Sequence, residues 1–230
     1  MKVIGMIGGM SWESSLEYYR LVNEGVKTAL GGLHSARCLM YSVEFAEIEA
    51  LQHRGAWDEL TDIMTDAGQR LRKGGADFIL ICTNTMHRMA EAVEKEAGIP
   101  LLHIADATGE RIRSMDLTRV GLLGTKFTME QDFYKGRLKK KFGIEVLVPD
   151  DRGRDVIHSI IYNELCLGTI REDSRMRYVD IINELVGRGA QGIVLGCTEI
   201  PLLVKQGDVT VPIFDTTAIH AKAAVDFALQ

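Results

Sequence analysis

Two polar clusters in the sequence each follow a short run of apolar residues. They are Cys82-Thr83-Asn84-Thr85-Met86-His87 and Gly196-Cys197-Thr198-Glu199. If the apolar runs are buried parallel strands, both clusters lie at carboxyl ends of strands, the edge at which open α/β sheets bind ligands. A helix that follows such a strand points unpaired N–H groups and a positive dipole end at the site, which favours a substrate carboxylate.

Cys197 has the clearest chemistry in these clusters. A thiol at a helix N-terminus has its pKa lowered from the free value of about 8.5 toward neutrality, so it could act as a base or a nucleophile. A buried cysteine can also be a small core residue, but the neighbours Gly196, Thr198 and Glu199 favour a reactive role. Core packing is the default for the other three cysteines, Cys38, Cys82 and Cys166.

An internal repeat relates the two clusters. Residues 75–84 align without gaps with residues 189–198, which places Thr83 opposite Cys197. Residues 3–9 resemble residues 120–125, and residues 100–106 resemble residues 212–217. Three matched segments in the same order favour a duplication over chance similarity.

The elements that must position these residues read as alternating strands and helices, the pattern of an α/β fold with parallel sheets. The predicted strands are 3–7, 37–43, 78–82, 101–104, 120–123, 145–148, 193–195 and 213–214, and the predicted helices are 14–30, 57–73, 86–97, 130–142, 155–167 and 173–188. With the duplication, this predicts two pseudo-symmetric doubly wound halves, 1–105 (joined by a C-terminal helix, 216–230) and 106–215. A duplicated fold tends to hold its site in the cleft between its halves.

The composition limits the class of protein. The 230 residues carry 32 acidic and 27 basic side chains, a net charge of -5, without a run of like charges for nucleic acid or an anionic membrane. The N-terminal apolar stretch is too short for a signal peptide, and no segment reaches membrane-spanning length. We therefore expect a cytoplasmic protein with no nucleic-acid or membrane partner, whose four cysteines stay reduced.

Cofactor and metal motifs do not stand out in the chain. The glycine pairs Gly8-Gly9 and Gly31-Gly32 do not form the dinucleotide-binding pattern, and the cysteine spacings match no metal site. His87 could pair with a cysteine as in thiol hydrolases, but a single histidine near a helix start is more often a capping or packing residue. Glu199 could modulate the Cys197 thiol or cap the next helix.

Both clusters, together with Gly8-Gly9-Met10-Ser11-Trp12, resemble signature segments of the aspartate/glutamate racemase superfamily. The likeness covers nearly the whole chain and is closest to the broad-specificity aspartate/glutamate racemases. It implies a cofactor-independent isomerase, without pyridoxal phosphate, that acts on an acidic amino acid and forms a homodimer. In that family two cysteines face the substrate Cα from opposite sides, one removing a proton and the other returning one.

This chain departs from that pattern because Thr83 stands at the first cysteine position. A threonine hydroxyl has too high a pKa to be a ready base at neutral pH, so proton abstraction should be unequal on the two faces of Cα. Cys197 can remove the Cα proton, and Thr83 can only deliver one. By resemblance to threonine-bearing relatives, the L enantiomer is the expected substrate.

Several polar residues are candidates for substrate binding. Hydroxyl, amide and backbone N–H groups can stabilise negative charge on the substrate carboxylate, and capping or turn formation is the competing interpretation for each. The residues from Leu51 to Arg54 are predicted to be a loop that acts as a lid and receives the distal carboxylate, with solvent exposure as the alternative. The candidate set is Met10, Ser11, Gln52, Arg54, Asn84, Thr85, Met86, Thr125, Cys166 and Thr198.

Two other functions stay open at this point. A branch of the same superfamily uses one cysteine in the second half to protonate an enolate after decarboxylation, and Thr83 makes a single-cysteine decarboxylase conceivable. A catalytically weak amino-acid-binding protein would keep the cleft and lose the two-sided chemistry.

Overall fold

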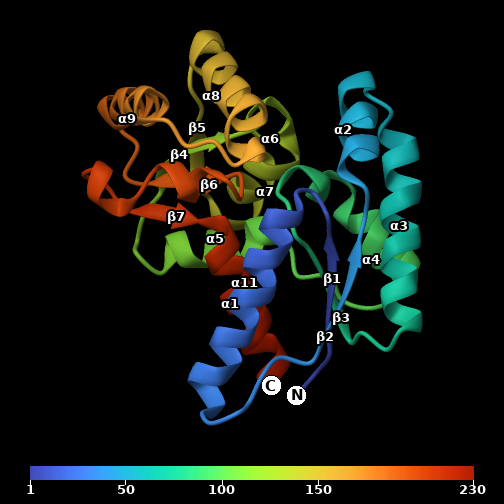
Figure 1. Ribbon diagram of the computed structural model, residues 1–230. Helices are drawn as coiled ribbons and strands as arrows, with labels where there is room; N and C mark the ends of the chain where they lie inside the picture. The colour runs from blue at the N-terminus through green and yellow to red at the C-terminus, as the bar shows by residue number, and fades with distance from the viewer. The chain divides into compact units, whose positions relative to one another are not determined.

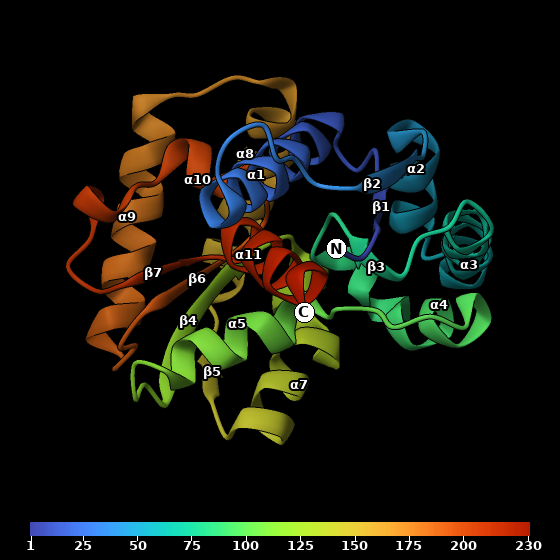
Figure 2. The same ribbon diagram turned by 90° about the horizontal axis from the view of Figure 1, so that it is seen from below.

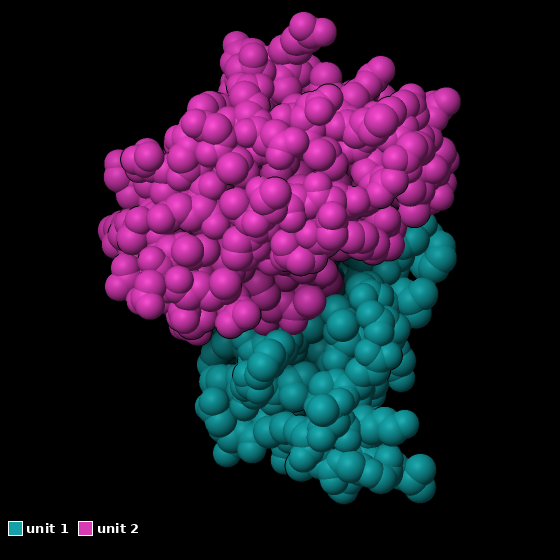
Figure 3. Space-filling model, turned by 90° about the vertical axis from the view of Figure 1, so that its left-hand side faces the viewer, with its two compact units in different colours: residues 1–104, 220–230 teal, residues 105–219 magenta.

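The chain forms two compact α/β units, each built around its own parallel sheet. The computed structural model describes residues 1–230. Unit 1 comprises residues 1–104 and 220–230, and unit 2 comprises residues 105–219; Figure 3 colours them teal and magenta. The chain passes between the units twice, within helices α5 (Ile104–Arg113) and α11 (Thr216–Leu229). The predicted fold class of two parallel-sheet α/β halves is confirmed.

Unit 1 contains a three-stranded sheet in the order β2-β1-β3. An isolated parallel bridge between Ile79 and Leu101 adds one residue pair on the outer side of β3. The elements are β1 (Ile4–Gly8), α1 (Trp12–Leu30), β2 (Cys38–Ser42), α2 (Phe45–Arg54), α3 (Trp57–Lys73), β3 (Phe78–Ile81), η1 (Thr85–Met89) and α4 (Ala90–Ala97), with η marking a 3-10 helix.

Both faces of this sheet are buried, which is why its central strands are continuously apolar. On β1, Ile7 packs with residues of α2, α3 and α4, whereas Ile4 and Met6 pack with residues of α1 and α11. Figure 1 shows α2, α3 and α4 on one side of the sheet and α1 with α11 on the other. The two ends of the chain are paired, because the N–H of Lys2 donates to the carbonyl of Ala228 at 2.8 Å.

Unit 2 contains a four-stranded sheet in the order β5-β4-β6-β7. One face packs against α8 and α9, and α5 and α7 lie side by side on its other side (Figure 2), where Tyr134 donates a hydrogen bond to Thr108 at 3.3 Å. The elements are β4 (Arg119–Gly124), α6 (Lys126–Glu130), α7 (Asp132–Phe142), β5 (Glu145–Leu147), α8 (Asp151–Asn163), η2 (Leu165–Leu167), α9 (Glu172–Gly187), β6 (Ile193–Gly196), α10 (Ile200–Leu203), η3 (Gln206–Asp208) and β7 (Ile213–Asp215).

The strand register is the same in the two sheets. Gly5 of β1 pairs with Ile79 of β3, and Gly121 of β4 pairs with Ile193 of β6. The strand order also corresponds, with β2, β1 and β3 matching β5, β4 and β6. The alignment of residues 75–84 with 189–198 therefore has a structural counterpart in each unit.

Four predicted elements differ from the structure, and one of them is the helix predicted at 155–167, which breaks at Glu164 into α8 and the 3-10 helix η2. The strand predicted at residues 101–104 is wrong, because only Leu101 makes a bridge and Ile104 already begins α5. The helix predicted at 86–97 starts as the 3-10 helix η1, and the one predicted at 130–142 is interrupted at Gln131. Gln131 has an extended backbone (φ -78°, ψ 156°), so it ends α6 and precedes α7. Hydrophobic periodicity does not register a one-residue break of this kind.

No helix of the structure combines the length and the apolar character needed to cross a bilayer.

Candidate active site

In unit 1, Met10 and Ser11 follow the carboxyl end of β1. Ser11 caps α1, and its Oγ accepts a hydrogen bond from the N–H of Ser14 at 3.4 Å. Gly9 makes the turn into this segment with φ +89°, and a Cβ at this position would lie 2.2 Å from the carbonyl oxygen of Val43. Only glycine fits there, so the turn that carries Met10 and Ser11 is fixed by packing as well as by backbone conformation.

Thr83 lies two residues beyond β3, and Asn84 and Thr85 lead into η1. Thr83 is half-buried, whereas Asn84 and Thr85 are buried. Met86 has no exposed surface and belongs to the core that also contains Met10. The strand end thus presents hydroxyl and amide groups above an apolar floor, which is a suitable arrangement for holding a small polar substrate.

The predicted lid at Leu51 to Arg54 is wrong as a loop, because these residues form the last turn of helix α2. Amphipathic packing of Ile48 and Leu51 against the core of unit 1 holds this turn in helical form. Gln52 is buried, and its Nε2 donates to the Met86 sulfur at 3.2 Å, whereas Arg54 is exposed. Gln52 therefore joins the cluster at the strand ends, and Arg54 does not.

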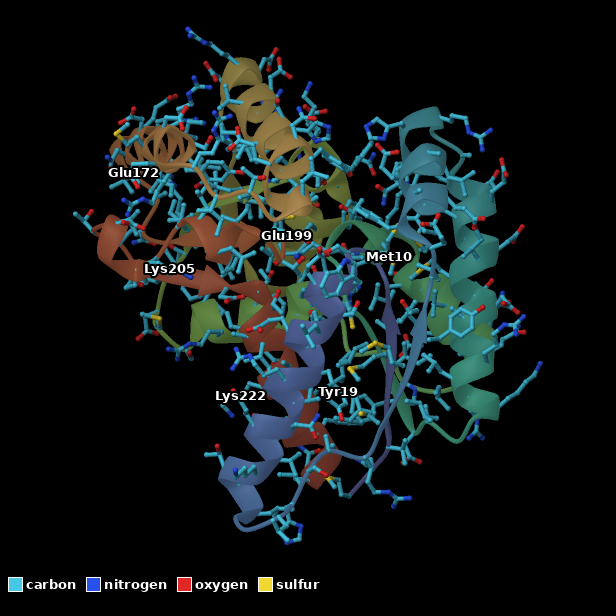
Figure 4. All side chains as sticks on the ribbon, in the orientation of Figure 1. Met10, Tyr19, Glu172, Glu199, Lys205 and Lys222 are labelled. Atoms are coloured by element: carbon cyan, nitrogen blue, oxygen red, sulfur yellow. The ribbon has the colours of Figure 1, made fainter.

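In unit 2, Cys197 directly follows β6 and precedes α10. Its thiol donates a hydrogen bond to Glu199 Oε2 at 2.9 Å, and the hydroxyl of Thr198 donates to the same oxygen at 2.8 Å. Cys197 and Glu199 are both buried, and Figure 4 labels Glu199 beside this strand end. A buried carboxylate thus accepts two hydrogen bonds from the residues immediately before it.

The pKa of Cys197 is raised well above its ordinary value, first because burial penalises the thiolate and then because the Glu199 carboxylate repels it. The expectation that a helix N-terminus lowers this pKa is therefore wrong. Helix α10 has only four residues, so its dipole is too weak to outweigh burial and a neighbouring negative charge. The resting group is a thiol whose proton is directed at Glu199.

Two further candidates lie in unit 2. Thr125 follows β4 and caps α6, and its Oγ1 accepts a hydrogen bond from the N–H of Thr128 at 3.3 Å. Cys166 lies on η2, is half-buried, and packs against the hydrophobic core that contains Cys197. Thr125, Cys166, Cys197 and Thr198 therefore belong to one side of unit 2.

The other cysteines lie in apolar surroundings. Cys82 is completely buried in the core beneath α1 and α11, and burial raises the pKa of its thiol. Burial also raises the pKa of Cys38. No group of three or more His, Cys, Asp or Glu side chains is arranged to hold a metal ion.

Two residues outside the predicted set contact the candidate catalytic positions. Glu199 accepts from Cys197, and the Nδ1 of His87 lies 2.8 Å from the carbonyl oxygen of Thr83. The signals available in the sequence were spacings of two and four residues from the reactive positions. Such spacings are common, so they acquire meaning only when the local backbone is known.

Comparison with known proteins decides the family. The model for the family described as Asp/Glu/hydantoin racemase matches residues 7–224. The chain belongs to this family. The resemblance inferred from the sequence motifs is thereby confirmed, and the chain is an amino-acid racemase, an isomerase.

Three similar proteins align with all or nearly all of the chain. The crystal structure of a candidate Asp/Glu racemase from Yersinia pestis is 55% identical, with a TM-score of 0.94 and complete coverage of both chains. An aspartate racemase homologue from Pyrococcus horikoshii OT3 is 35% identical, also over both complete chains, with a TM-score of 0.87. The broad specificity amino-acid racemase RacX of Bacillus subtilis (strain 168) is 24% identical over 97% of this chain and 96% of its own.

Proposed function

We propose that this racemase interconverts the enantiomers of aspartate and glutamate without a cofactor, with Cys197 as the base at Cα and Thr83 as the group on the opposite face. The observation that carries the proposal is the shared register of the two sheets. Thr83 lies four residues after Ile79 and Cys197 four residues after Ile193, and each isoleucine pairs with the equivalent glycine of the central strand. Equivalent positions of a duplicated fold suit a reaction that needs one group on each face of a carbon.

The proton path begins at the hydrogen bond between Cys197 and Glu199. The Cys197 S–H proton passes to the Glu199 carboxylate, and the thiolate then takes the Cα proton and becomes a thiol again. The electron pair left on the substrate spreads into its α-carboxylate. A proton from the Thr83 hydroxyl returns to Cα on the other face. Water restores the hydroxyl, and the hydroxide that this forms takes the proton held by Glu199, so that all three side chains regain their starting state.

The substrate carboxylate needs hydrogen-bond donors to hold the developing charge. Ser11, Asn84, Thr85, Thr125 and Thr198 supply them in this proposal, since each follows the carboxyl end of a strand in its unit. Gln52 receives the distal carboxylate in preference to Arg54, because it is buried beside Met86 whereas Arg54 faces solvent. Met10 and Cys166 contact the substrate in this proposal, by resemblance to the family.

A preference for the L enantiomers follows from the two unequal groups. A thiol is far more acidic than a threonine hydroxyl, and Cys197 has the Glu199 carboxylate to receive its proton, so abstraction is efficient only on the side of Cys197. Thr83→Cys should therefore raise the exchange rate of D-aspartate and D-glutamate by about tenfold or more, on the scale typical of general acid–base groups. A variant that keeps the original enantiomer preference would mean that another feature sets the asymmetry.

The direct test is to follow loss of the Cα–H signal by NMR for L- and D-aspartate and glutamate in D2O. Exchange of the L substrates that disappears in Cys197→Ser supports the proposal. The matched control is Cys82→Ser, a buried cysteine at the end of the equivalent strand that has no proposed role. Exchange that survives in Cys197→Ser would contradict the assignment of the base.

The same purified protein can be tested for the two alternative functions, decarboxylation and amino-acid binding. Arylmalonate decarboxylase shares the fold, with a TM-score of 0.53 at 15% identity over 98% of this chain. Release of carbon dioxide from a malonate-type compound, without exchange of amino acids, would favour a decarboxylase. Ligand-induced thermal stabilisation without exchange or decarboxylation would favour a binding protein.

We also propose a homodimer located in the cytoplasm. Trp12, Leu16 and Tyr19 form an apolar stripe on α1, and each is more than half exposed (Figure 4 labels Tyr19). Such a stripe suits a face covered by a second copy of the chain. Leu16→Glu should shift the sedimentation coefficient from that of a dimer to that of a monomer.

The cytoplasmic location is proposed because a reducing compartment suits the four free thiols.

A further inference from the structure

His87 lies on the 3-10 helix η1, four residues after Thr83, and is almost completely buried. Its two ring nitrogens both make contacts with the main chain. Nδ1 lies 2.8 Å from the carbonyl oxygen of Thr83, and Nε2 lies 3.2 Å from the backbone nitrogen of Ile104. The side chain therefore connects Thr83, two residues beyond β3, to the point at which the chain leaves unit 1 in α5.

The partners of the His87 ring determine which nitrogen carries its proton. The backbone N–H of Ile104 can only donate, so Nε2 must accept and carry no proton. The carbonyl of Thr83 can only accept, so Nδ1 carries the proton and donates it. The neutral Nδ1–H tautomer satisfies both contacts, whereas the other neutral tautomer would satisfy neither.

Two further histidines hold the ring of His87 in place. The ring of His103 lies 4.7 Å from it between centroids, and that of His220 lies 5.6 Å away in an edge-on arrangement. His220 is itself fixed, since the carbonyl of Leu102 accepts from its Nε2 and the hydroxyl of Tyr18 donates to its Nδ1, both at 2.8 Å. Burial lowers the pKa of His220 to about 4, so this neighbour stays neutral at physiological pH.

The Thr83 carbonyl needs such a partner because it lies outside the sheet. Strand β3 ends at Ile81, and the last ladder contact on this side is from the N–H of Cys82 to the carbonyl of Ile7 at 2.9 Å. A free carbonyl at this point would let the Thr83 peptide rotate and carry its side chain with it. A catalytic group that is misplaced by about 1 Å can lose roughly a hundredfold in rate.

We propose that His87 is a positioning residue that fixes the orientation of Thr83 by donating a hydrogen bond to its carbonyl while Ile104 locks the tautomer of the ring. This rests on the proposed function, in which the Thr83 hydroxyl delivers a proton to Cα. The role needs no contact between His87 and the substrate. It requires that the donor at the Nδ1 position be present and aimed at the Thr83 carbonyl.

Two amide substitutions separate the two contacts. The side-chain nitrogen of asparagine can occupy the place of Nδ1 and donate to Thr83, but it does not reach Ile104. The longer glutamine can accept from Ile104 at the place of Nε2, but it has no donor at the Nδ1 position. His87→Asn should therefore keep kcat for L-aspartate and L-glutamate exchange within about threefold, and His87→Gln should lower it by about ten- to a hundredfold with little change in KM.

Met89→Ala is the matched packing control, because Met89 is buried on the same 3-10 helix and its side chain has no hydrogen-bond donor for the Thr83 carbonyl. It should lower the melting temperature while leaving kcat nearly unchanged. Equal kcat values in His87→Asn and His87→Gln would overturn the proposal. So would losses of kcat that follow the loss of melting temperature across all three variants, since that is the signature of a packing role.

A second readout does not depend on catalysis. The ¹⁵N chemical shifts of the His87 ring should report the Nδ1–H tautomer. The ¹³C shift of the Thr83 carbonyl should move on loss of its hydrogen bond in His87→Gln and stay close to wild type in His87→Asn. If the wild-type protein exchanges neither aspartate nor glutamate, the proposed function fails, and these shifts still decide whether His87 holds Thr83. A protonated Nε2 or an unmoved carbonyl shift would refute the contact itself.

Discussion

Cys197 combines two properties that conflict in a resting active site. A base must lose its proton, yet burial and the Glu199 carboxylate both raise the pKa of this thiol. The conflict is resolved if the carboxylate that repels the thiolate also receives its proton, since the hydrogen bond between the two groups is already formed. The substrate ammonium group, which is positive, would then favour the thiolate once it is bound.

The residue-scale prediction concerns the charge of Glu199. Glu199→Gln removes a negative charge beside the thiol, so the pKa of Cys197 should fall and the thiolate should form at lower pH than in the wild type. The 240 nm absorbance of the protein minus that of its Cys197→Ser variant, followed against pH, measures this midpoint. Thr198→Val keeps the charge and serves as the control. An unchanged midpoint in Glu199→Gln would mean that burial alone sets the pKa of Cys197, and a higher midpoint would mean that Glu199 stabilises the thiolate; either result would contradict the prediction.

At the scale of elements, the turn after β1 is the most tightly constrained part of the candidate site. Gly9 has a positive φ and almost no space for a Cβ, whereas Gly31, at the end of α1, has φ +76° and no atom within 4 Å of the Cβ position. Both glycines thus have a backbone conformation that is unfavourable for other residues, but only Gly9 is closely packed. They form a matched pair for separating the two effects.

Gly31→Ala should lower the free energy of unfolding by about 1–3 kcal/mol, the cost of holding an L residue in a glycine-only conformation. Gly9→Ala should cost more than that, because its Cβ also meets the Val43 backbone at 2.2 Å and forces the turn to move. Gly9→Ala should in addition slow Cα exchange, since the turn carries Met10 and Ser11. Urea denaturation followed by circular dichroism compares the two, and equal losses would show that the close approach relaxes without cost.

Elements also mark the limit of what the sequence could predict. Strands such as Phe78–Ile81 were predictable because the apolar run is uninterrupted between Asp77 and Thr83, and the repeat fixed the correspondence of the strands. Helix α2 was missed because its pattern is weak and its second half, Leu51-Gln52-His53-Arg54, is mostly polar. The thiol pKa could not be predicted either, because burial and the orientation of Glu199 are tertiary properties.

At the scale of the whole molecule, His220 links stability to pH. Its pKa is lowered from 6.5 to about 4 in the folded chain because the ring is buried. Between these values the unfolded chain binds a proton that the folded chain does not, so the free energy of unfolding falls as the pH drops from about 6.5 toward 4. Above that range His220 contributes no pH dependence.

The difference between the two pKa values corresponds to about 3 kcal/mol. Wild-type protein should therefore lose more stability between pH 7 and pH 4.5 than His220→Gln does, by about 2–3 kcal/mol in urea unfolding experiments at the two pH values. The variant itself should be less stable at pH 7, since Tyr18 loses its acceptor. If the free energy of unfolding fell equally with pH in the two proteins, folded His220 would gain its proton without a loss of stability, and the prediction would be wrong.

The last eleven residues, 220–230, belong to the first unit, and they supply Ala221, Ala224, Val225 and Ala228 to its core. A ribosome therefore finishes unit 2 before it has made the final piece of unit 1. Until then, one face of the first sheet lacks half of its cover, and its apolar residues are exposed in the growing chain. A chain stopped after Ile219 should consequently keep unit 2 resistant to protease, whereas its unit 1 should be cleaved. Unit 1 is thus the first unit to be synthesised and the last that can complete its fold.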